Sequence, residues 1–570
     1  MNGFIVTLSF DGSPLPETYT WKPLFDFQQE HRSSAYQQAG LFIEQFTPDK
    51  FREHKFFEEN SEGFLATEGL VTNILSLYES EGCSTAGTLI RKLLMTGPTS
   101  LNKLHGNFAG VYYEKSSKQL TIFNNQTGTQ KIFYYRDEHY FAASTDLWVL
   151  TTTLRNLGIQ LTPDCDAIQM LLSYGFMLED FSLVKQIRQL TAGQLLTINT
   201  HETKLTSYFH LKEIKIRDGQ RKELIDQLES MFQQAVHEEY MLDQHYGYQS
   251  VSTMSGGLDS RMTALAAHEA GYKQQLLNFS QKGYADEKIA RQIARHYHFE
   301  LQSIHLSAES LVDIDEVIRV NDGLTMYSGA SHVLHALRRV QFNHRGVLHT
   351  GMLGDAIMGS YLSAPYAVPA KSSSGAYAPI EGGFSGELFN SIAAGYPSEE
   401  LFKFYNRAFQ GINNGYQYLY LFSESLSPFM HPGFLQLALS IPREFMYKEK
   451  LYIEWMMSRH PKRASFCWEN IGGRPTNSTI LRSFYRLRRA IVKRLPVKSM
   501  WKNSMTPEQY WYENSETVRT TLDAYFHKQL DQSIITELLR QQLRQLYEQQ
   551  EFTRKAQVLT VLSALKHLFP

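Results

Sequence analysis

The stretch from residue 249 to residue 306 constrains the fold most, because strand and helix patterns alternate there at regular intervals. The expected strands are Gln249–Met254, Gln274–Phe279 and Glu300–Leu306, and the expected helices are Ser260–Ala270 and Ala285–Tyr297. Helices of about 10–15 residues between strands are typical of βαβ units, whose strands lie parallel and whose helices cover the sheet. The sequence therefore predicts a doubly wound α/β domain in the second half of the chain.

The turn after the first of these strands has the composition of a phosphate-binding loop. It reads Ser255-Gly256-Gly257-Leu258-Asp259-Ser260. The two glycines allow backbone N–H groups to turn toward an anion, and the helix that follows adds the positive end of its dipole. Asp259 would repel a phosphate, so its presence indicates a bound Mg²⁺. The alternative is a glycine-rich turn with an ordinary capping aspartate.

This hexapeptide resembles the PP-loop of the ATP pyrophosphatases, which cleave ATP between its α and β phosphates. Later segments resemble asparagine synthetases and follow their order: Phe279-Ser280, Gly351-Met352-Leu353-Gly354-Asp355, and Ser427-Pro428-Phe429 with Leu437–Pro442. The resemblance implies ATP and Mg²⁺ as cofactors, with the loop from Ser255 to Ser260 on the pyrophosphate. It also implies that Phe279 and Gly351 border the nucleotide and that Asp355 is a second metal ligand opposite Asp259.

The first half of the chain has short strand patterns and a second resemblance. Gly106-Asn107-Phe108-Ala109, Gly128, Phe133-Tyr134 and Ser144 are similar to landmarks of the Ntn-type glutamine amidohydrolase domain. The two resemblances together imply two domains. Residues 1–210 are expected to form an αββα Ntn-hydrolase-like sandwich, and residues 211–570 a PP-loop domain with a helical C-terminal extension.

The residues for glutamine hydrolysis are replaced in the N-terminal half. The family uses a cysteine directly after the initiator Met as nucleophile, and Asn2 stands at that position. Glu68 and Leu70 fall where the family stabilises the oxyanion and binds the substrate ammonium, and Asn124-Asn125 replaces its Arg-Asp pair. The sequence therefore predicts that the glutaminase-like domain is inactive and that glutamine does not supply the nitrogen.

The synthetase half also departs from the family pattern. Met352 replaces a glutamate of the family pattern, and Ala356 replaces an acidic residue. Arg261 directly follows the phosphate-binding loop, and it is either a cation beside the phosphates or a surface residue. The family's catalytic lysine would fall within residues 468–473, which contain none. Lys450 or Arg474 is the candidate substitute.

These features predict an AMP-forming carbon–nitrogen ligase that adenylates a carboxylate and forms an amide with an amine. The expected substrate is a small molecule or a peptide, delivered in the second case by a partner protein. Family members without glutaminase activity include β-lactam synthetases and lasso-peptide macrolactam cyclases, in which the attack is intramolecular. The alternatives are an asparagine synthase or sugar-acid amidase that uses free ammonia, and a catalytically silent scaffold that binds a nucleotide or a peptide.

Composition limits the remaining possibilities. The formal net charge of −2 argues against nucleic-acid binding by bulk charge, and three scattered cysteines argue against a disulfide scaffold. The absence of a signal-like start and of a long apolar run predicts a cytoplasmic protein without an integral membrane segment. Two further segments each allow more than one interpretation. The basic stretch 480–495 is either a contact for a substrate or a membrane or a solvated helix, and residues 371–386 are either a substrate lid or a mobile insertion.

Overall fold

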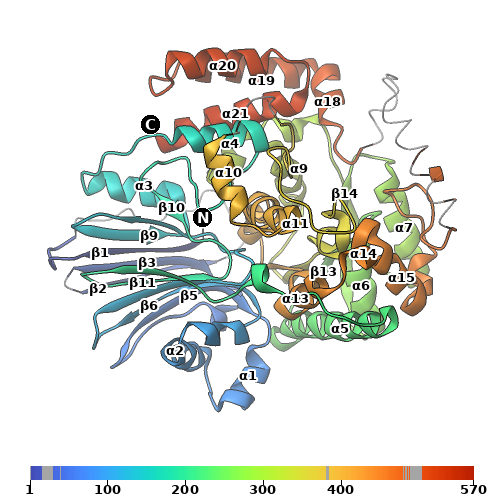
Figure 1. Ribbon diagram of the computed structural model, residues 1–570, viewed down its shortest axis with the longest axis horizontal. Helices are drawn as coiled ribbons and strands as arrows, with labels where there is room; N and C mark the ends of the chain where they lie inside the picture. The colour runs from blue at the N-terminus through green and yellow to red at the C-terminus, as the bar shows by residue number, and fades with distance from the viewer. Residues whose placement is uncertain are drawn as a thin grey trace.

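The computed structural model describes residues 2–15, 30–38, 40–379, 384, 386–478, 481, 484–485, 487 and 504–570. Its N-terminal half is a pair of stacked sheets, and its C-terminal half is built on a separate parallel sheet (Figure 1). A group of C-terminal helices lies along the top of both halves in this view.

Two six-stranded antiparallel sheets form the N-terminal half. Their strand orders are β10-β8-β9-β1-β3-β2 and β12-β11-β7-β6-β5-β4. The bounds are β1 Gly3–Ser9, β2 His31–Gln38, β3 Leu41–Pro48, β4 Phe57–Glu59, β5 Gly63–Val71, β6 Gly106–Glu114, β7 Gln119–Asn124, β8 Phe133–Arg136, β9 Tyr140–Ser144, β10 Arg188–Gln189, β11 Gln194–Ile198 and β12 Thr203–Ser207.

Apolar side chains hold the two sheets together. Phe4 and Val6 of the first sheet share one buried cluster with Val111 and Ile122 of the second. Because successive strand residues point to opposite faces, the outer faces need covers of their own. Helices α1 (Ile74–Glu81) and α2 (Ala86–Thr96) cover one outer face, and α3 (Leu147–Asn156) and α4 (Cys165–Tyr174) the other. The predicted αββα sandwich is confirmed.

The C-terminal half contains a five-stranded parallel sheet in the order β15-β14-β13-β16-β17. Its neighbouring residues Leu276 and Leu277 lie in different buried clusters, the first with helices α6 and α7 and the second with α8 and α9. Helices therefore cover both faces, as the doubly wound prediction requires. The bounds are β13 Gln249–Thr253, β14 Gln274–Ser280, β15 Leu301–His305, β16 Arg345–His349, β17 Ser425–Leu426, α5 Arg221–Tyr246, α6 Asp259–Glu269, α7 Ala285–Tyr297, α8 Ile314–Asn321 and α9 Ser328–Leu337.

The remaining helices follow β16 in the chain. They are α10 Glu387–Ala394, α11 Glu399–Lys403, α12 Asn413–Gly415, α13 Pro432–Ser440, α14 Arg443–Met446, α15 Lys450–Arg459, α16 Pro461–Ala464, α18 Glu508–Asn514, α19 Glu516–Leu530, α20 Glu537–Tyr547 and α21 Phe552–Leu568. Helix α21 is buried along most of its length and packs against α8 of the C-terminal half and α4 of the N-terminal half. The predicted helical extension thus fastens the two halves to each other.

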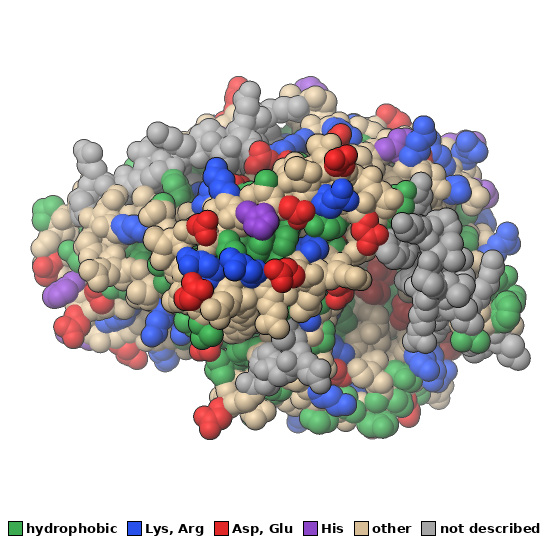
Figure 2. Space-filling model, turned by 90° about the horizontal axis from the view of Figure 1, so that it is seen from above, with side chains coloured by type: hydrophobic (Ala, Val, Ile, Leu, Met, Phe, Trp, Pro, Cys, Tyr) green, Lys and Arg blue, Asp and Glu red, His purple; other side chains and the backbone are tan. Residues whose placement is uncertain are grey.

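Charged side chains of both signs are interspersed over the face of the molecule shown in Figure 2. This distribution follows from the near balance of 56 basic and 58 acidic residues in the chain. Among the residues that the structure describes, none of the helices combines the length and the apolar character needed to cross a membrane.

Candidate nucleotide site

The predicted phosphate loop lies between β13 and α6, at the carboxyl end of the parallel sheet. Its two serines hold it in shape, because the Ser260 hydroxyl accepts from the Ser255 amide at 3.0 Å and lies 2.9 Å from the Ser255 hydroxyl. The Ser255 hydroxyl also accepts from the Gly257 amide at 3.1 Å. Both hydroxyls therefore lie at the start of α6, where a helix favours an anion.

Gly256 is required by close packing on both sides of the loop. A Cβ atom at this position would lie 2.5 Å from a carboxylate oxygen of Asp286 and 2.6 Å from Cβ of Glu469. Asp286 accepts a hydrogen bond from the Gly256 amide at 2.8 Å, and the Gly256 carbonyl accepts from the Glu469 amide at 3.0 Å. The Gly256 amide thus already has an anionic acceptor within the protein, which differs from the prediction that it faces a phosphate.

The loop after β16, the strand that pairs with β13, brings Asp355 next to Asp259. The Asp355 amide donates to the Asp259 carboxylate at 2.9 Å, and the Ser360 hydroxyl donates to the Asp355 carboxylate at 3.0 Å. A Cβ atom on Gly351 would lie 2.3 Å from the backbone of Asp259, so only glycine permits this approach. The two acids predicted as metal ligands are therefore neighbours.

Two residues that the sequence analysis missed complete this cluster. The Tyr452 hydroxyl donates to Asp259 at 2.8 Å from a fully buried side chain, and Glu449 adds a further negative charge. Burial, and next the charge of Asp355, raise the pKa of Asp259 well above its ordinary value. Both missed residues lie beside Lys450 in the sequence, but no motif distinguishes them there.

Three of the eight non-glycine residues with positive φ in the described part of the chain lie at this place. Leu353, Lys448 and Glu449 have φ angles of 63°, 61° and 59°, in the left-handed region that non-glycine residues rarely adopt. Each such residue costs about 1–3 kcal/mol and persists only where the surrounding structure imposes it. Strain of this kind gathers at functional sites, which is an independent reason to regard the loop around Asp355 and the start of α15 as one site.

Phe279 lies near the end of β14, beyond the point where β13 stops. Thr253, the last residue of β13, pairs with Leu277, whereas Phe279 pairs on its other side with Ile304 of β15. The β13 side of the Phe279 backbone therefore borders the phosphate loop, and the Asn278 side chain donates to the Met254 carbonyl at 2.8 Å. This position is compatible with the predicted contact to the nucleotide base.

Arg261 is neither a phosphate-binding cation nor a surface residue, which corrects both sequence interpretations. Its side chain is completely buried and donates to the carbonyls of Arg463, Phe466, Cys467 and Gly256. Burial lowers the pKa of its guanidinium to about 10, so the group stays charged at neutral pH. Arg261 therefore ties the segment around residue 466 to the phosphate loop.

The segment expected to hold the family's lysine does lie against the phosphate loop. Trp468 and Gly473 form a β-bridge, and between them Glu469 accepts a hydrogen bond from the Tyr284 hydroxyl. This segment thus contains an acid and no lysine. Both candidate substitutes, Arg474 and Lys450, are exposed to solvent, and Lys450 is the first residue of α15.

Residues 371–379, part of the segment interpreted as a substrate lid or a mobile insertion, are held by hydrogen bonds. The Tyr174 hydroxyl of α4 donates to the Ser372 carbonyl at 2.7 Å. The Tyr174 carbonyl accepts from the Tyr377 amide at 3.1 Å. Arg554 of α21 donates to the Pro379 carbonyl at 2.7 Å. Hydrogen bonds from α4 of one half and α21 of the other therefore hold this stretch. The basic stretch 480–495 lies, apart from residues 481, 484–485 and 487, outside the described residues.

A separate cluster has the composition of a metal site but the wrong protonation for one. His105, Glu238 and His431 bring their polar atoms within 4.8 Å of one another. However, Nδ1 of His431 accepts from the Gly433 and Phe434 amides at 3.1 and 3.4 Å, so its proton lies on Nε2 and blocks that ligand atom. Burial opposes ionisation of Glu238, but hydrogen bonds from both histidines outweigh it and lower the pKa. The cluster is an interdomain hydrogen-bond network.

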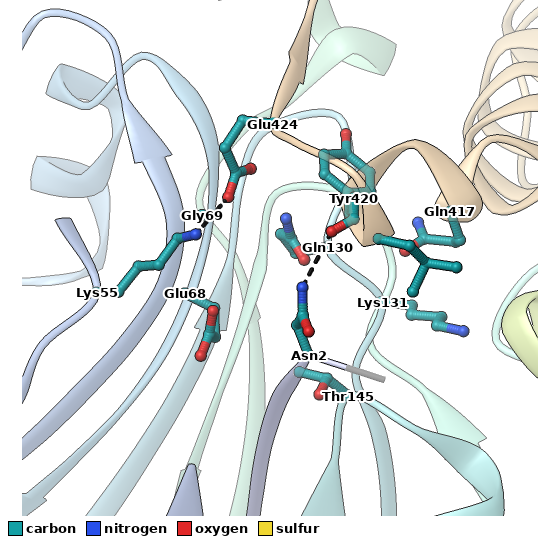
Figure 3. A pocket seen from close by; sticks show the side chains of 11 residues that line it. Asn2, Lys55, Glu68, Gly69, Gln130, Lys131, Thr145, Gln417, Tyr420 and Glu424 are labelled. Atoms are coloured by element: carbon teal, nitrogen blue, oxygen red, sulfur yellow. Dashed lines mark hydrogen bonds and ion pairs between the residues drawn. The ribbon is translucent and has the colours of Figure 1, made fainter. Parts of the chain in front are cut away.

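The glutaminase-like half carries its substituted residues in structural roles. The Asn2 side chain donates to the Tyr420 carbonyl at 3.0 Å, across the boundary between the halves (Figure 3). Leu70 is fully buried, and Asn124 and Asn125 donate to the carbonyls of Leu190 and Gly106 at 3.1 and 3.0 Å. Glu68 is buried and accepts from Thr47 at 2.8 Å.

Comparison with known proteins finds a family match in each half. A family model described as asparagine synthase matches residues 227–410, and one described as a glutamine amidotransferase domain matches residues 73–209. The chain is 25% identical over 254 residues to "Asparagine synthetase [glutamine-hydrolyzing] 2" of Bacillus subtilis (strain 168). That match covers 41% of this chain and 29% of the relative, so it spans less than a third of the relative's length.

Two solved structures overlap much of the chain at low similarity. One is the allosteric regulatory enzyme of purine biosynthesis, with 10% identity, a TM-score of 0.23, and 65% of this chain and 76% of that chain covered. The other is glutamine phosphoribosylpyrophosphate amidotransferase from B. subtilis, complexed with ADP and GMP. It has 11% identity and a TM-score of 0.22, and the match covers 70% of this chain and 84% of that chain. A family model matches part of each half, and each half has the sheets that its resemblance implied. The chain belongs to the asparagine synthetase-like superfamily.

Proposed function

We propose that the protein is an ATP-dependent ligase that adenylates a substrate carboxylate, releases pyrophosphate and forms an amide with a nitrogen nucleophile. The observation that carries the proposal is the meeting of Asp259 and Asp355 beside the serines of the phosphate loop. Two acids at the start of a helix have no use in binding a bare phosphate, but they suit a phosphate accompanied by a divalent cation.

The charges around the loop fit a bound Mg²⁺. Asp259, Asp355 and Glu449 bring negative charge together, and the buried cation nearest in sequence, Arg261, is engaged by backbone carbonyls on the other side of the loop. Anionic ATP is repelled by such a site unless a cation accompanies it. Asp259 and Asp355 would hold Mg²⁺, which when bound would neutralise the charge that develops on the departing pyrophosphate.

The other predicted residues have roles that follow from their positions. Ser255 and Ser260 would exchange their mutual hydrogen bond for bonds to phosphate oxygens, with Gly256, Gly257 and Leu258 forming the loop backbone between them. The open side of the Phe279 backbone would receive the adenine. Gly351 keeps the second loop close enough to α6 for Asp355 to act with Asp259.

The nitrogen donor is proposed to be an amine other than glutamine. Asn2 has no thiol to attack a glutamine amide, and its side chain is engaged by Tyr420. A substrate that carries both a carboxylate and an amine would satisfy the same site intramolecularly, as in macrolactam or β-lactam formation. Free ammonia acting on a small carboxylic acid is the alternative donor.

The test is to incubate the full chain with ATP, Mg²⁺ and fractions of small molecules or peptides from a lysate. Formation of AMP and pyrophosphate that depends on one fraction would support the proposal and begin to identify the substrate. ADP and phosphate would indicate a kinase-like reaction instead. ATP binding without either product for any fraction would favour the catalytically silent scaffold.

Replacing Lys450 by methionine tests whether this exposed lysine supplies the missing cation. If it stabilises the acyl-adenylate during amine attack, amide formation falls about 10²-fold while substrate-dependent pyrophosphate exchange persists. The matched control is Lys462→Met, because Lys462 is likewise exposed, on α16. Equal amide formation by the two variants would remove Lys450 from the mechanism.

Replacing Asn2 by alanine is expected to leave AMP formation unchanged. The variant loses two hydrogen bonds of the Asn2 side chain, one to the Tyr420 carbonyl and one with Nε2 of His31, so the free energy of unfolding should fall by about 2 kcal/mol. Urea unfolding and the AMP assay measure the two effects separately. Loss of AMP formation in a folded variant would show that the N-terminal half takes part in the reaction.

A further inference from the structure

The start of α18 lies at the carboxyl edge of the parallel sheet, although this helix belongs to the C-terminal extension. Gln281, the residue directly after β14, donates from its amide to the Met505 carbonyl at 3.3 Å and from its side chain to the Ser504 carbonyl. Glu508, the first residue of α18, closely follows this contact in the chain. Since the strands are parallel, Glu508 lies at the same edge of the sheet as the phosphate loop.

Glu508 has no cation beside it. Its side chain is partly buried, and burial raises the pKa of its carboxyl to about 7. Among the residues that the structure describes, no charged group acts on Glu508, and only the Ser328 hydroxyl opposes the effect of burial. A carboxylate withdrawn from water is unfavourable unless a donor or a cation accompanies it. The ionised Glu508 side chain therefore lacks a partner within the described structure.

Two buried hydroxyl groups near Glu508 also lack partners. Tyr327 and Ser328, at the start of α9, are fully buried, and neither hydroxyl forms a hydrogen bond of ordinary geometry within the described residues. Burial, and next the charge of Glu508, raise the pKa of the Tyr327 hydroxyl. Buried polar groups in proteins are nearly always hydrogen-bonded. The carboxylate and the two hydroxyls together therefore indicate a ligand that donates hydrogen bonds to them.

Two tyrosines connect this place with the predicted metal ligands. Tyr377 is 40% exposed, yet burial raises its pKa, so its ring faces a recess rather than the open surface. The charges of Glu508 and Arg407 both act on Tyr377, and Arg407 lies 4.6 Å from the centre of its ring. Burial, and next the charges of Tyr377 and Asp355, raise the pKa of Tyr416. Glu508 and Asp355 therefore lie near opposite ends of one row of side chains.

We propose that Glu508 binds the protonated primary amine of the substrate, whose remaining N–H groups donate to the hydroxyls of Ser328 and Tyr327. A primary ammonium group carries one positive charge and three N–H donors, which match one carboxylate and two free hydroxyl oxygens. A metal cation would require several more oxygen ligands. The carbon chain of the amine would pack against the ring of Tyr377. This proposal rests on the ligase function proposed above and specifies its nitrogen donor as a primary amine on a carbon chain.

The test measures thermal unfolding of the full chain near pH 8, without ATP, in n-butylammonium, ammonium and tetramethylammonium chloride at equal ionic strength. Ligand binding to the folded state raises the Tm, so butylammonium should raise it by about 2 °C or more above tetramethylammonium, which has no N–H donor. Glu508→Gln should abolish this difference, because it removes the unpaired charge. Glu516→Gln is the control, since Glu516 is an exposed acid that is likewise the first residue of its helix, α19.

Three results would overturn the proposal. Equal Tm values in butylammonium and tetramethylammonium would mean that water completes the contacts of Glu508. An equal gain in ammonium would show that the site does not select a primary amine, and a gain that persists in Glu508→Gln would place the amine elsewhere. If Glu508→Gln does not fold, Glu508→Asp replaces it, because this variant keeps the charge, withdraws it by one methylene group and should lose most of the difference.

This experiment separates the amine site from the ligase reaction, because it uses no ATP. AMP formation by a protein whose Tm does not respond to butylammonium would refute the role of Glu508 and leave the ligase function standing. A response to butylammonium that depends on Glu508, in a protein that forms no AMP with any fraction, would refute the ligase function and leave an amine-binding site.

Discussion

Replacing Asp355 by asparagine is expected to abolish substrate-dependent pyrophosphate release while the protein stays folded. The side chain of Asp355 is exposed and its only hydrogen-bond donor in the described contacts is the Ser360 hydroxyl at 3.0 Å, which an amide oxygen also accepts. The lost group is one charged metal ligand. Charge stabilisation by a bound metal is worth several kcal/mol in the transition state, so the rate should fall by about 10³-fold or more.

This prediction has a matched control and a second readout. Glu309→Gln removes an exposed acid near the end of β15, outside the cluster, and should leave the rate unchanged. Mg²⁺ with ATP should raise the Tm of the wild type and of the control more than that of Asp355→Asn. A folded Asp355→Asn variant that releases pyrophosphate at the wild-type rate would contradict the assigned role.

Replacing Arg261 by methionine is expected to have the largest effect on stability. The guanidinium donates to four backbone carbonyls, two of which are Gly256 of the phosphate loop and Cys467 of the segment beside it. Each buried acceptor left without a donor costs about 1–3 kcal/mol. The free energy of unfolding should therefore fall by about 3 kcal/mol or more, and Arg261→Lys should recover only part of this loss because one ammonium cannot reach all four oxygens.

Urea unfolding measures this loss, and nucleotide binding measures its consequence. Arg295→Met is the control, because Arg295 is exposed on α7 and surface replacements usually change stability by less than about 0.5 kcal/mol. A folded Arg261→Met variant should also bind ATP more weakly, since the loop loses its tie to Cys467. Stability equal to that of the control would mean that the segment holds its position without Arg261.

The strands and helices around the phosphate loop could be predicted because their hydrophobic patterns are local in the sequence. The predicted helix Ala285–Tyr297 has the bounds of α7, and the neighbouring strands and helices differ from prediction by a residue or two. Alternating strand and helix periods leave few ways to arrange a parallel sheet. The carboxyl ends of its strands meet at one edge. That Asp259 and Asp355 approach each other there was implied by the resemblance to asparagine synthetases.

The failures of the sequence analysis share one cause. Arg261 follows the loop in the sequence, yet its side chain turns inward to carbonyls around residue 466. Tyr452 and Glu449 have no motif, and they reach Asp259 only because the start of α15 packs beside the second loop. Residues 371–386 were interpreted as a substrate lid or a mobile insertion, but α4 and α21 anchor residues 371–379. In each case the partner comes from a distant part of the chain.

The sequence by itself determined the class of each half, and it predicted a phosphate loop and an inactive glutaminase-like domain. These properties depend on residue type and on spacing over short stretches, which a single sequence displays. Only the tertiary structure decided that Arg261 is a buried clamp and that Tyr452 completes the cluster around Asp259. Arg261 and Cys467, for example, lie 206 positions apart in the sequence. Packing between whole elements, rather than any local pattern, sets such contacts.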